Sequence, residues 1–131
     1  KRALALPVSV PSHSSLMLPA AEKLSQHLQT VKFLPPTIPV LHNTDVACHD
    51  DTVSIREALV RQLHTPVRWT ETIRRLKQMG SEQVWECGPG KVLTGLAKRI
   101  DASLPTNALV DEAVLANALA ACAPANCEVT Q

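Results

Sequence analysis

The chain has 131 residues, of which 45% are hydrophobic and 19% are charged. This apolar content excludes the disordered class, which cannot bury enough apolar surface to fold. No apolar run approaches the roughly 20 residues that a membrane-spanning helix needs, so we expect no membrane association. Aromatic residues make up only 2% of the chain, too few for the stacking platforms that bind nucleic acid.

Charge is divided unevenly along the chain. Residues 1–99 contain all 13 Lys and Arg and eight of the 12 acidic residues, whereas residues 100–131 contain four acidic residues and no Lys or Arg. A basic surface attracts acidic partners and phosphates over long distances. Charge that only keeps a protein in solution is the simpler interpretation.

The first forty residues predict two strands around one helix. Residues 3–10 are apolar and strand-like, and such a strand needs neighbours, so we expect the chain to begin at an internal point of a longer protein. Residues 37–41 predict a second strand, which Pro39 makes irregular. The helix between them is predicted from an apolar stripe at four-residue spacing, formed by Leu16, Ala20, Leu24 and Leu28.

Two further helices are predicted between residues 54 and 80. Ser54 and Glu57 have the spacing of a capping box, and the helix that they open would bury Ile55, Leu59 and Leu63 and end at residues 64–66. A second helix near residues 69–79 would end at Gly80, because glycine is favoured just past a helix C-terminus.

The C-terminal part continues the alternation of strands and helices. Residues 83–87 predict a strand, Gly88-Pro89-Gly90 a sharp turn, and residues 91–96 the start of a helix. A last strand is expected at residues 107–110, followed by an Ala-rich helix at 112–122. Strands that alternate with helices predict an α/β protein with parallel strand pairing.

His13 is the strongest candidate for a catalytic group. It follows the first predicted strand and lies in a turn that opens a helix, where a rigid scaffold can hold a side chain open to substrate. A neutral imidazole takes a proton from a hydroxyl and returns it to a leaving group. A capping or surface role is the alternative. Ser12 and Ser14 are poor nucleophiles for His13, because adjacent side chains seldom point at each other.

Two other motifs could suggest a ligand site. One loop is rich in metal-ligand types, His42, Asp45, Cys48, His49, Asp50 and Asp51, but zinc sites favour tighter paired spacing, so we predict no metal. Asp50 and Asp51 are well explained as caps or dipole partners of the next helix. Gly88-Pro89-Gly90-Lys91 matches neither a phosphate loop nor a dinucleotide loop.

The cysteines give no sign of a zinc or redox site. Cys48, Cys87, Cys122 and Cys127 are scattered and form no CxxC pair. Free thiols are the simplest interpretation, and they are typical of a cytoplasmic protein.

Four stretches together resemble the malonyl-CoA:acyl carrier protein transacylases of bacterial type II fatty-acid synthesis. They are LPVSVPSHSSLM at residues 6–17, PVLHNTDV at 39–46, LVRQLHTPVRW at 59–69 and ECGPGKVLTGL at 86–96. Their order and separations match as well, and the resemblance covers about residues 1–110 of the chain. It identifies the chain as the C-terminal part of such an enzyme.

The resemblance implies a Ser-His ping-pong mechanism without a cofactor, with malonyl-CoA as substrate. A serine attacks the malonyl thioester, CoA leaves, and the pantetheine thiol of acyl carrier protein takes the malonyl group. The family's histidine falls on His13, and the backbone carbonyl that orients it falls on Gln62. The residue before the histidine, Ser12, lies near the acyl pocket in this superfamily, with helix capping as its alternative role.

The resemblance also implies two subdomains and an acidic partner. The end of a small ferredoxin-like subdomain would occupy residues 1–10, part of a large α/β-hydrolase-like subdomain residues 11–110, and a C-terminal helix and tail residues 111–131. Acyl carrier protein is acidic, and the expected docking residues are Lys1, Arg2, Lys98 and Arg99, with solvated charge as the alternative.

Two elements of the family pattern are missing from the chain. It contains no GxSxG motif for the nucleophile, and the family's carboxylate-binding arginine also lies upstream. We therefore expect the chain to be inactive alone and to act with the N-terminal part of the same enzyme. A polyketide-type acyltransferase with another acyl substrate and a non-catalytic remnant that binds a partner stay open as alternatives.

Overall fold

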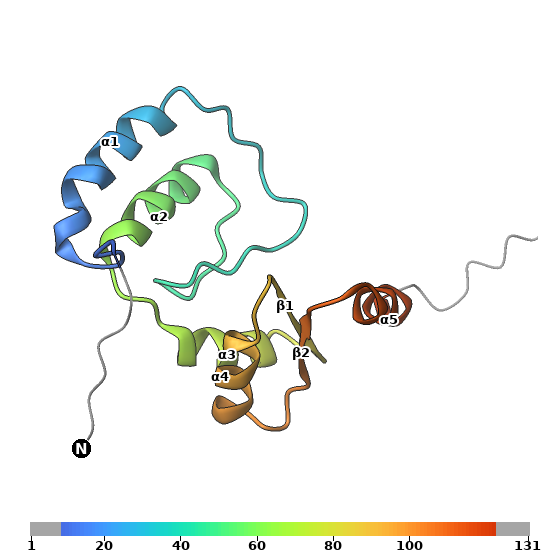
Figure 1. Ribbon diagram of the computed structural model, residues 1–131. Helices are drawn as coiled ribbons and strands as arrows, with labels where there is room; N and C mark the ends of the chain where they lie inside the picture. The colour runs from blue at the N-terminus through green and yellow to red at the C-terminus, as the bar shows by residue number, and fades with distance from the viewer. Residues whose placement is uncertain (1–8, 123–131) are drawn as a thin grey trace, which may run out of the picture. The chain divides into compact units, whose positions relative to one another are not determined.

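The computed structural model describes residues 9–122 of the chain, with side chains up to residue 120 (Figure 1). It divides the chain into two compact units, residues 1–72 and 73–131. Within the described range no helix has both the length and the apolar character needed to cross a membrane. The elements in order are a 3₁₀ turn η1 (Ser15–Met17), α1 (Leu18–Leu28), α2 (Thr52–His64), α3 (Trp69–Gln78), β1 (Val84–Cys87), α4 (Val92–Ile100), β2 (Thr106–Leu109) and α5 (Glu112–Cys122).

The first unit is built on α1 and α2, which pack side by side (blue and green in Figure 1). Ala21 and Leu28 of α1 and Ala58 of α2 are buried, and the two alanines let the helix backbones approach closely. The predicted apolar stripe is wrong at its first member. Leu16 belongs to η1, before the helix begins, and is 74% exposed.

The N-terminus of α2 is capped by Asp51. Its Oδ1 accepts hydrogen bonds from the amides of Val53 at 3.0 Å and Ser54 at 2.8 Å. The capping-box prediction is therefore wrong in its position, since Ser54 is already inside the helix. The role predicted for Asp51 as a helix cap is confirmed, because a carboxylate satisfies amides that have no partner in the first turn.

The strand predicted at residues 37–41 does not form. Its only ladder contact in the described chain is an isolated antiparallel bridge between Leu41 and Cys48. Pro36 and Pro39 have no amide hydrogen, so the segment cannot supply a continuous row of donors. Of the first predicted strand, residues 3–8 lie outside the described residues, and residues 9 and 10 are in no strand.

The second unit contains a strand-helix-strand unit, which confirms the predicted parallel pairing. β1 and β2 are parallel, with Val84 opposite Thr106 and Cys87 opposite Leu109. Both α4 and α5 contact β2. The buried side chains include Ala97 of α4, Leu104 before β2 and Ala118 of α5. The chain is thus of the α/β class, as its alternation of elements predicts.

An ion pair joins the last turn of α3 to the residue that follows α4. The Lys77 ammonium at the end of α3 donates to Asp101 Oδ2 at 2.7 Å, beyond the end of α4, and also donates to Ser103 Oγ. The hydrogen bonds from Lys77 and then from Ser103 lower the pKa of Asp101 to about 2. The carboxylate therefore stays charged through the neutral range.

The end of α3 is closed by Gly80, two residues past Gln78, in a Schellman arrangement. The Ser81 amide donates to the Leu76 carbonyl at 3.1 Å and the Gly80 amide to the Lys77 carbonyl at 3.0 Å. Gly80 has a φ of 87°, a left-handed conformation that glycine adopts without steric cost. The predicted stop at Gly80 is confirmed.

We predict opposite effects of alanine at two glycines. Gly80→Ala should lower the free energy of unfolding by about 1–2 kcal/mol, because an L-residue pays for left-handed backbone. Gly95→Ala should raise it by about 0.5–1 kcal/mol, because Gly95 lies inside α4 and its new Cβ would meet no atom within 4 Å. Urea denaturation followed by circular dichroism measures both free energies of unfolding. A change of the same sign in both variants would contradict the different roles given to Gly80 and Gly95.

Candidate functional site

His13 is held in a strained backbone conformation. Its φ is 61°, a left-handed value that is uncommon for any residue other than glycine. Its amide donates to the carbonyl of Leu63 at 2.9 Å, which fixes the turn against the end of α2. Residues held in such conformations by their surroundings concentrate at functional sites, so the strain supports His13 as a candidate.

The imidazole of His13 is anchored at one nitrogen. Nδ1 lies 3.2 Å from the carbonyl oxygen of Thr65. A carbonyl oxygen can only accept, so Nδ1 carries the proton and the neutral ring keeps Nε2 as an acceptor. This is the tautomer in which Nε2 can act as a base.

The ring of His13 has a hydrogen-bond contact with the backbone oxygen of Thr65, three residues after Gln62. The role expected for the Gln62 carbonyl stays a prediction. Gln62 and Thr65 both belong to the end of α2, where the chain turns into an extended conformation at Thr65. This turn brings the Thr65 carbonyl toward the ring, a local change that residue spacing does not reveal.

The C-terminus of α2 offers free carbonyls for a chemical reason. The last carbonyls of a helix have no amide partner within the helix, and residue 66 is a proline, which has no amide hydrogen to offer to Gln62. The Arg61 carbonyl is satisfied locally, by the amide of Thr65 at 3.1 Å and its hydroxyl at 2.8 Å. The next carbonyls are thus available to the His13 turn.

A cavity of about 200 Å³ adjoins His13. It is lined by Ser12, His13, Met17, Gln62 and Leu63. The cavity brings together three residues that we singled out in the sequence as site residues, His13, Ser12 and Gln62, and it adds Met17 and Leu63. Only the spacing of Met17 four residues after His13, in the turn that opens a helix, could have suggested it.

The loop at residues 42–49 braces the same end of α2. Asp45 Oδ2 accepts from Arg61 Nη2 at 2.5 Å and from His49 Nε2 at 2.9 Å. Burial alone would raise the pKa of Asp45, but the hydrogen bonds from His49, Ala47 and Arg61 lower it overall. No sequence pattern predicts the pairing of Asp45 with Arg61, because the two are 16 residues apart.

A second contact ties this loop to the segment after α2. The amide of Arg68 donates to the Asn43 carbonyl at 2.8 Å, and the Arg68 guanidinium forms an ion pair with Glu71. Val46 has a φ of 60°, a genuine outlier for a β-branched residue. Its amide donates a hydrogen bond to the His42 carbonyl at 3.0 Å, which holds this conformation.

The two histidines of the loop lie close together. Their ring centroids are 5.2 Å apart. Burial lowers the pKa of His42, and the neighbouring His49 and Arg61 lower it further, against the effect of Asp45. Across the described residues, no three His, Cys, Asp or Glu side chains are grouped so that they could hold a metal ion.

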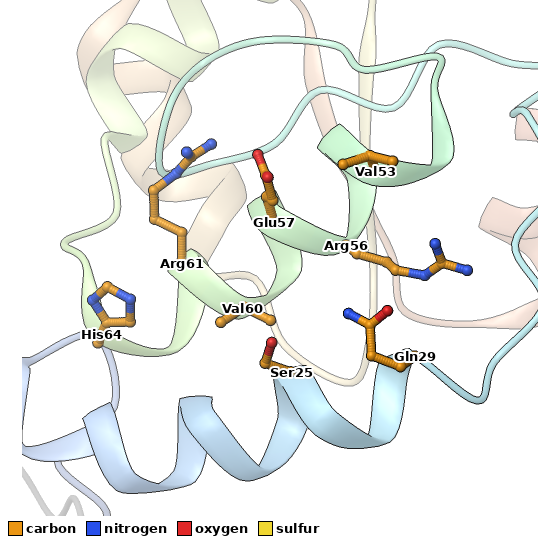
Figure 2. A pocket seen from close by; sticks show the side chains of 8 residues that line it. All are labelled: Ser25, Gln29, Val53, Arg56, Glu57, Val60, Arg61 and His64. Atoms are coloured by element: carbon orange, nitrogen blue, oxygen red, sulfur yellow. The ribbon is translucent and has the colours of Figure 1, made fainter.

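A larger cavity of about 520 Å³ lies between α1 and α2 (Figure 2). Ser25 of α1, Gln29 just past the end of α1 and Val60 of α2 line it (Figure 2). The two guanidinium groups that also line it, those of Arg56 and Arg61, already have partners. Arg56 donates to the carbonyls of Leu28 at 3.1 Å and Val31 at 3.0 Å, and Arg61 pairs with Asp45. The two guanidinium groups of this cavity thus close the end of α1 and hold α2 in place.

The Gly88-Pro89-Gly90 turn does not prepare a phosphate site. The amides at the start of α4 are occupied by the Glu86 carboxylate, which accepts from Thr94 at 2.7 Å and Leu93 at 3.1 Å. The bond from the Thr94 amide is the main cause that lowers the pKa of Glu86. Sequence reasoning missed this cap, because Glu86 lies in β1 and not beside the helix.

The expected docking residues are described only in part. Lys98 and Arg99 lie in the last turn of α4 and are exposed, whereas Lys1 and Arg2 lie outside the described residues. Cys48 and Cys87 are free thiols at the surface. Cys127 and the side chain of Cys122 are outside the described part of the chain.

Comparisons with known proteins find malonyl CoA-acyl carrier protein transacylases that are similar to this chain. No family model matches it. The chain is 54% identical to the malonyl CoA-acyl carrier protein transacylase of Salmonella typhimurium over 119 residues, which are 91% of this chain and 38% of that protein. The chain thus spans less than two fifths of the length of this curated relative.

Two solved structures agree. The crystal structure of an acyl carrier protein S-malonyltransferase from Vibrio cholerae matches 90% of this chain, and 39% of its own, with a TM-score of 0.85 and 52% identity. The complex of the malonyl-transacylase PlMCAT with the type II polyketide carrier protein AntF matches 92% of this chain, and 39% of its own, with a TM-score of 0.88 and 51% identity. The predicted resemblance is confirmed: over nine-tenths of its length the chain matches a segment of these transacylases.

We predict that the neutral His13 ring carries its proton on Nδ1. The reason is that the carbonyl of Thr65 accepts only from a protonated nitrogen. Long-range ¹H–¹⁵N correlation spectra distinguish the two tautomers of each histidine, and the exposed His27 in α1 is a suitable comparison within the same spectrum. A ring that is protonated mainly on Nε2 would show that the Thr65 contact does not persist in solution.

Proposed function

Because the chain matches a segment of the malonyl CoA-acyl carrier protein transacylases, we propose that it is part of a protein that transfers malonyl groups. The complete protein would take the malonyl group from malonyl-CoA and pass it to the phosphopantetheine thiol of acyl carrier protein. The observation that carries this proposal is the 54% identity over 91% of the chain. The complex of a similar transacylase with a carrier protein supports the choice of acceptor.

His13 is the general base and acid of this reaction. A serine hydroxyl supplied by the part of the protein outside this chain loses its proton to Nε2 and attacks the thioester carbon. The carbon–sulfur bond breaks, and His13 returns the proton to the leaving CoA thiolate. In the second half, Nε2 takes the proton of the pantetheine thiol, which attacks the malonyl ester, and then gives the proton back to the serine oxygen.

A backbone carbonyl replaces the usual carboxylate as the partner of Nδ1. The bond to Thr65 at 3.2 Å supports this role, since a partner at one ring nitrogen fixes the tautomer and the ring orientation. The Gln62 carbonyl, which residue 66 cannot satisfy because it is proline, is a second acceptor at the same helix end. The reaction needs no metal and no cofactor, because the thioester itself is activated for transfer.

The remaining part of the protein completes the fold. We infer that residues 1–10 end a small ferredoxin-like subdomain, that 11–110 belong to a large α/β-hydrolase-like subdomain, and that 111–131 form a C-terminal helix and tail. Large apolar side chains in both units support a covering partner, since Ile38 is 74% exposed and Val92 is 71% exposed. The chain alone is then inactive, and the complete protein works in the cytoplasm.

Ser12 and the basic residues serve substrate binding. Ser12 lines the cavity beside His13, which supports contact with the acyl group. Lys98 and Arg99 are exposed at the end of α4, and together with Lys1 and Arg2 they would attract an acidic carrier protein by long-range electrostatics.

We expect His13→Ala to cut malonyl transfer by the complete protein about 100-fold or more, because general acid–base catalysis contributes 10²–10⁴-fold. Transfer from radiolabelled malonyl-CoA to acyl carrier protein measures the effect, and circular dichroism confirms folding. His27→Ala, at an exposed position of α1, is the matched control and should keep normal turnover. Near-normal turnover in the folded His13→Ala protein would refute the mechanism.

We expect reversal of the α4 charges to affect only the second half-reaction. Lys98→Glu with Arg99→Glu should lower kcat/KM for acyl carrier protein on the order of 10-fold, because steering by opposite charge is lost. Acylation of the protein by malonyl-CoA should stay unchanged. Arg74→Glu with Arg75→Glu, at exposed positions of α3, makes the same change of charge elsewhere. Equal effects of both double variants would show that net charge, and not a docking surface, matters.

A further inference from the structure

We propose that Asp45 is a positioning residue for His13, on which it acts through Arg61 and the end of α2. This inference rests on the proposed function and deepens it. A general base transfers protons efficiently only while its ring is held in the productive geometry. The groups that hold His13 are backbone carbonyls, so the contacts that fix this stretch of backbone also fix the base.

The carbonyls that hold His13 lie at the end of α2. The His13 amide donates to the Leu63 carbonyl at 2.9 Å, and Nδ1 of the ring lies 3.2 Å from the Thr65 carbonyl oxygen. Helix ends fray, because their last carbonyls have no partners within the helix. The orientation of His13 therefore depends on contacts from outside α2 that keep this helix end in place.

The loop at residues 42–49 contacts the chain on both sides of these carbonyls. On the N-terminal side, Asp45 Oδ2 accepts from Arg61 Nη2 at 2.5 Å. On the C-terminal side, the Arg68 amide donates to the Asn43 carbonyl at 2.8 Å, and Arg68 Nη1 donates to the backbone oxygen of Asp45 at 3.4 Å. One loop thus holds both ends of the segment that carries the two carbonyls.

Arg61 is bonded directly to the residue whose carbonyl contacts the ring. The Arg61 carbonyl accepts from the Thr65 amide at 3.1 Å and from the Thr65 hydroxyl at 2.8 Å. These two bonds fix Thr65 at the point where the chain leaves the helix. A displacement of Arg61 would therefore displace the oxygen that contacts His13.

The Asp45 carboxylate is oriented by contacts other than Arg61. Its Oδ1 accepts from the Ala47 amide at 3.3 Å, and its Oδ2 also accepts from His49 Nε2 at 2.9 Å. A fixed carboxylate gives the guanidinium one position, through a charge-assisted hydrogen bond. Because the Arg61 side chain is 42% exposed, water screens the pair and it contributes little to stability. Its loss should loosen the helix end and leave the fold intact.

The test measures single-turnover acylation of the complete protein by malonyl-CoA. Asp45→Ala should lower the maximal rate about 10-fold, since a misplacement of 1 Å can cost about 10²-fold. The malonyl-CoA concentration that gives half the maximal rate should not change. Arg61→Ala should have the same effect, and the double variant should be no slower than either single variant, because all three lack the same contact.

A spectroscopic measurement separates positioning from a general loss of stability. In long-range ¹H–¹⁵N spectra of the folded Asp45→Ala protein, the His13 ring should lose its preference for a proton on Nδ1. Asp101→Ala is the matched control. Asp101 pairs with Lys77 at 2.7 Å in the second unit, and its side chain is 21% exposed, as is that of Asp45. This control should keep the wild-type acylation rate and the wild-type His13 signals.

Each outcome decides the inference. An unchanged rate or an unchanged His13 spectrum in Asp45→Ala, an equal loss in Asp101→Ala, or losses that multiply in the double variant would overturn the role of Asp45. Wild-type malonyl transfer would still support the proposed function. A wild-type protein that transfers no malonyl group overturns both. If Asp45→Ala does not fold, Asp45→Asn keeps an acceptor oxygen without the charge, and an unchanged rate in it also overturns the inference.

Discussion

The first unit depends on the carbonyl groups at the C-terminus of α2. A helix leaves its last carbonyls without partners, and the sequence beyond α2 cannot supply all the missing donors because residue 66 is a proline. Two other carbonyls of this region are reached from a turn 50 residues earlier, where the amide of His13 donates to Leu63 and its ring contacts Thr65. The bonds that satisfy these two carbonyls are the same bonds that hold the proposed base in one orientation.

The helix end is itself braced from a third segment. Arg61, one residue before Gln62, is held by the Asp45 carboxylate, and the amide of Arg68, just past the helix, is held by the Asn43 carbonyl. Both partners belong to the loop in which Val46 is strained, with a φ of 60°. A strained residue costs about 1–3 kcal/mol and persists only where its surroundings over-determine it. Here the bracing contacts on both sides of the helix end offset that strain.

Local rules were sufficient for part of the fold. Gly80 predicts the end of α3, and Asp51 predicts the start of α2. The alternation of strands and helices predicts the β1-α4-β2 unit. Local rules fail where a group distant in the sequence determines the local structure. The cap of α4 is Glu86, which lies in a strand. The segment at residues 37–41, expected to be a strand, has no neighbouring strand to pair with in the described chain. At the candidate site, the sequence indicates His13, Ser12 and Gln62 but not Met17, and a turn of the backbone at Thr65 decides which carbonyl meets the ring.

Residues 11–17 are held by two separate sets of hydrogen bonds. The backbone and the ring of His13 are fixed by bonds to Leu63 and Thr65, whereas Met17 is fixed by bonds within its own turn, through Ser14 and Pro11. No bond that holds the imidazole passes through the Met17 side chain, so a substitution at residue 17 would leave the contacts of His13 in place. The same independence does not hold for Leu63, whose backbone holds His13.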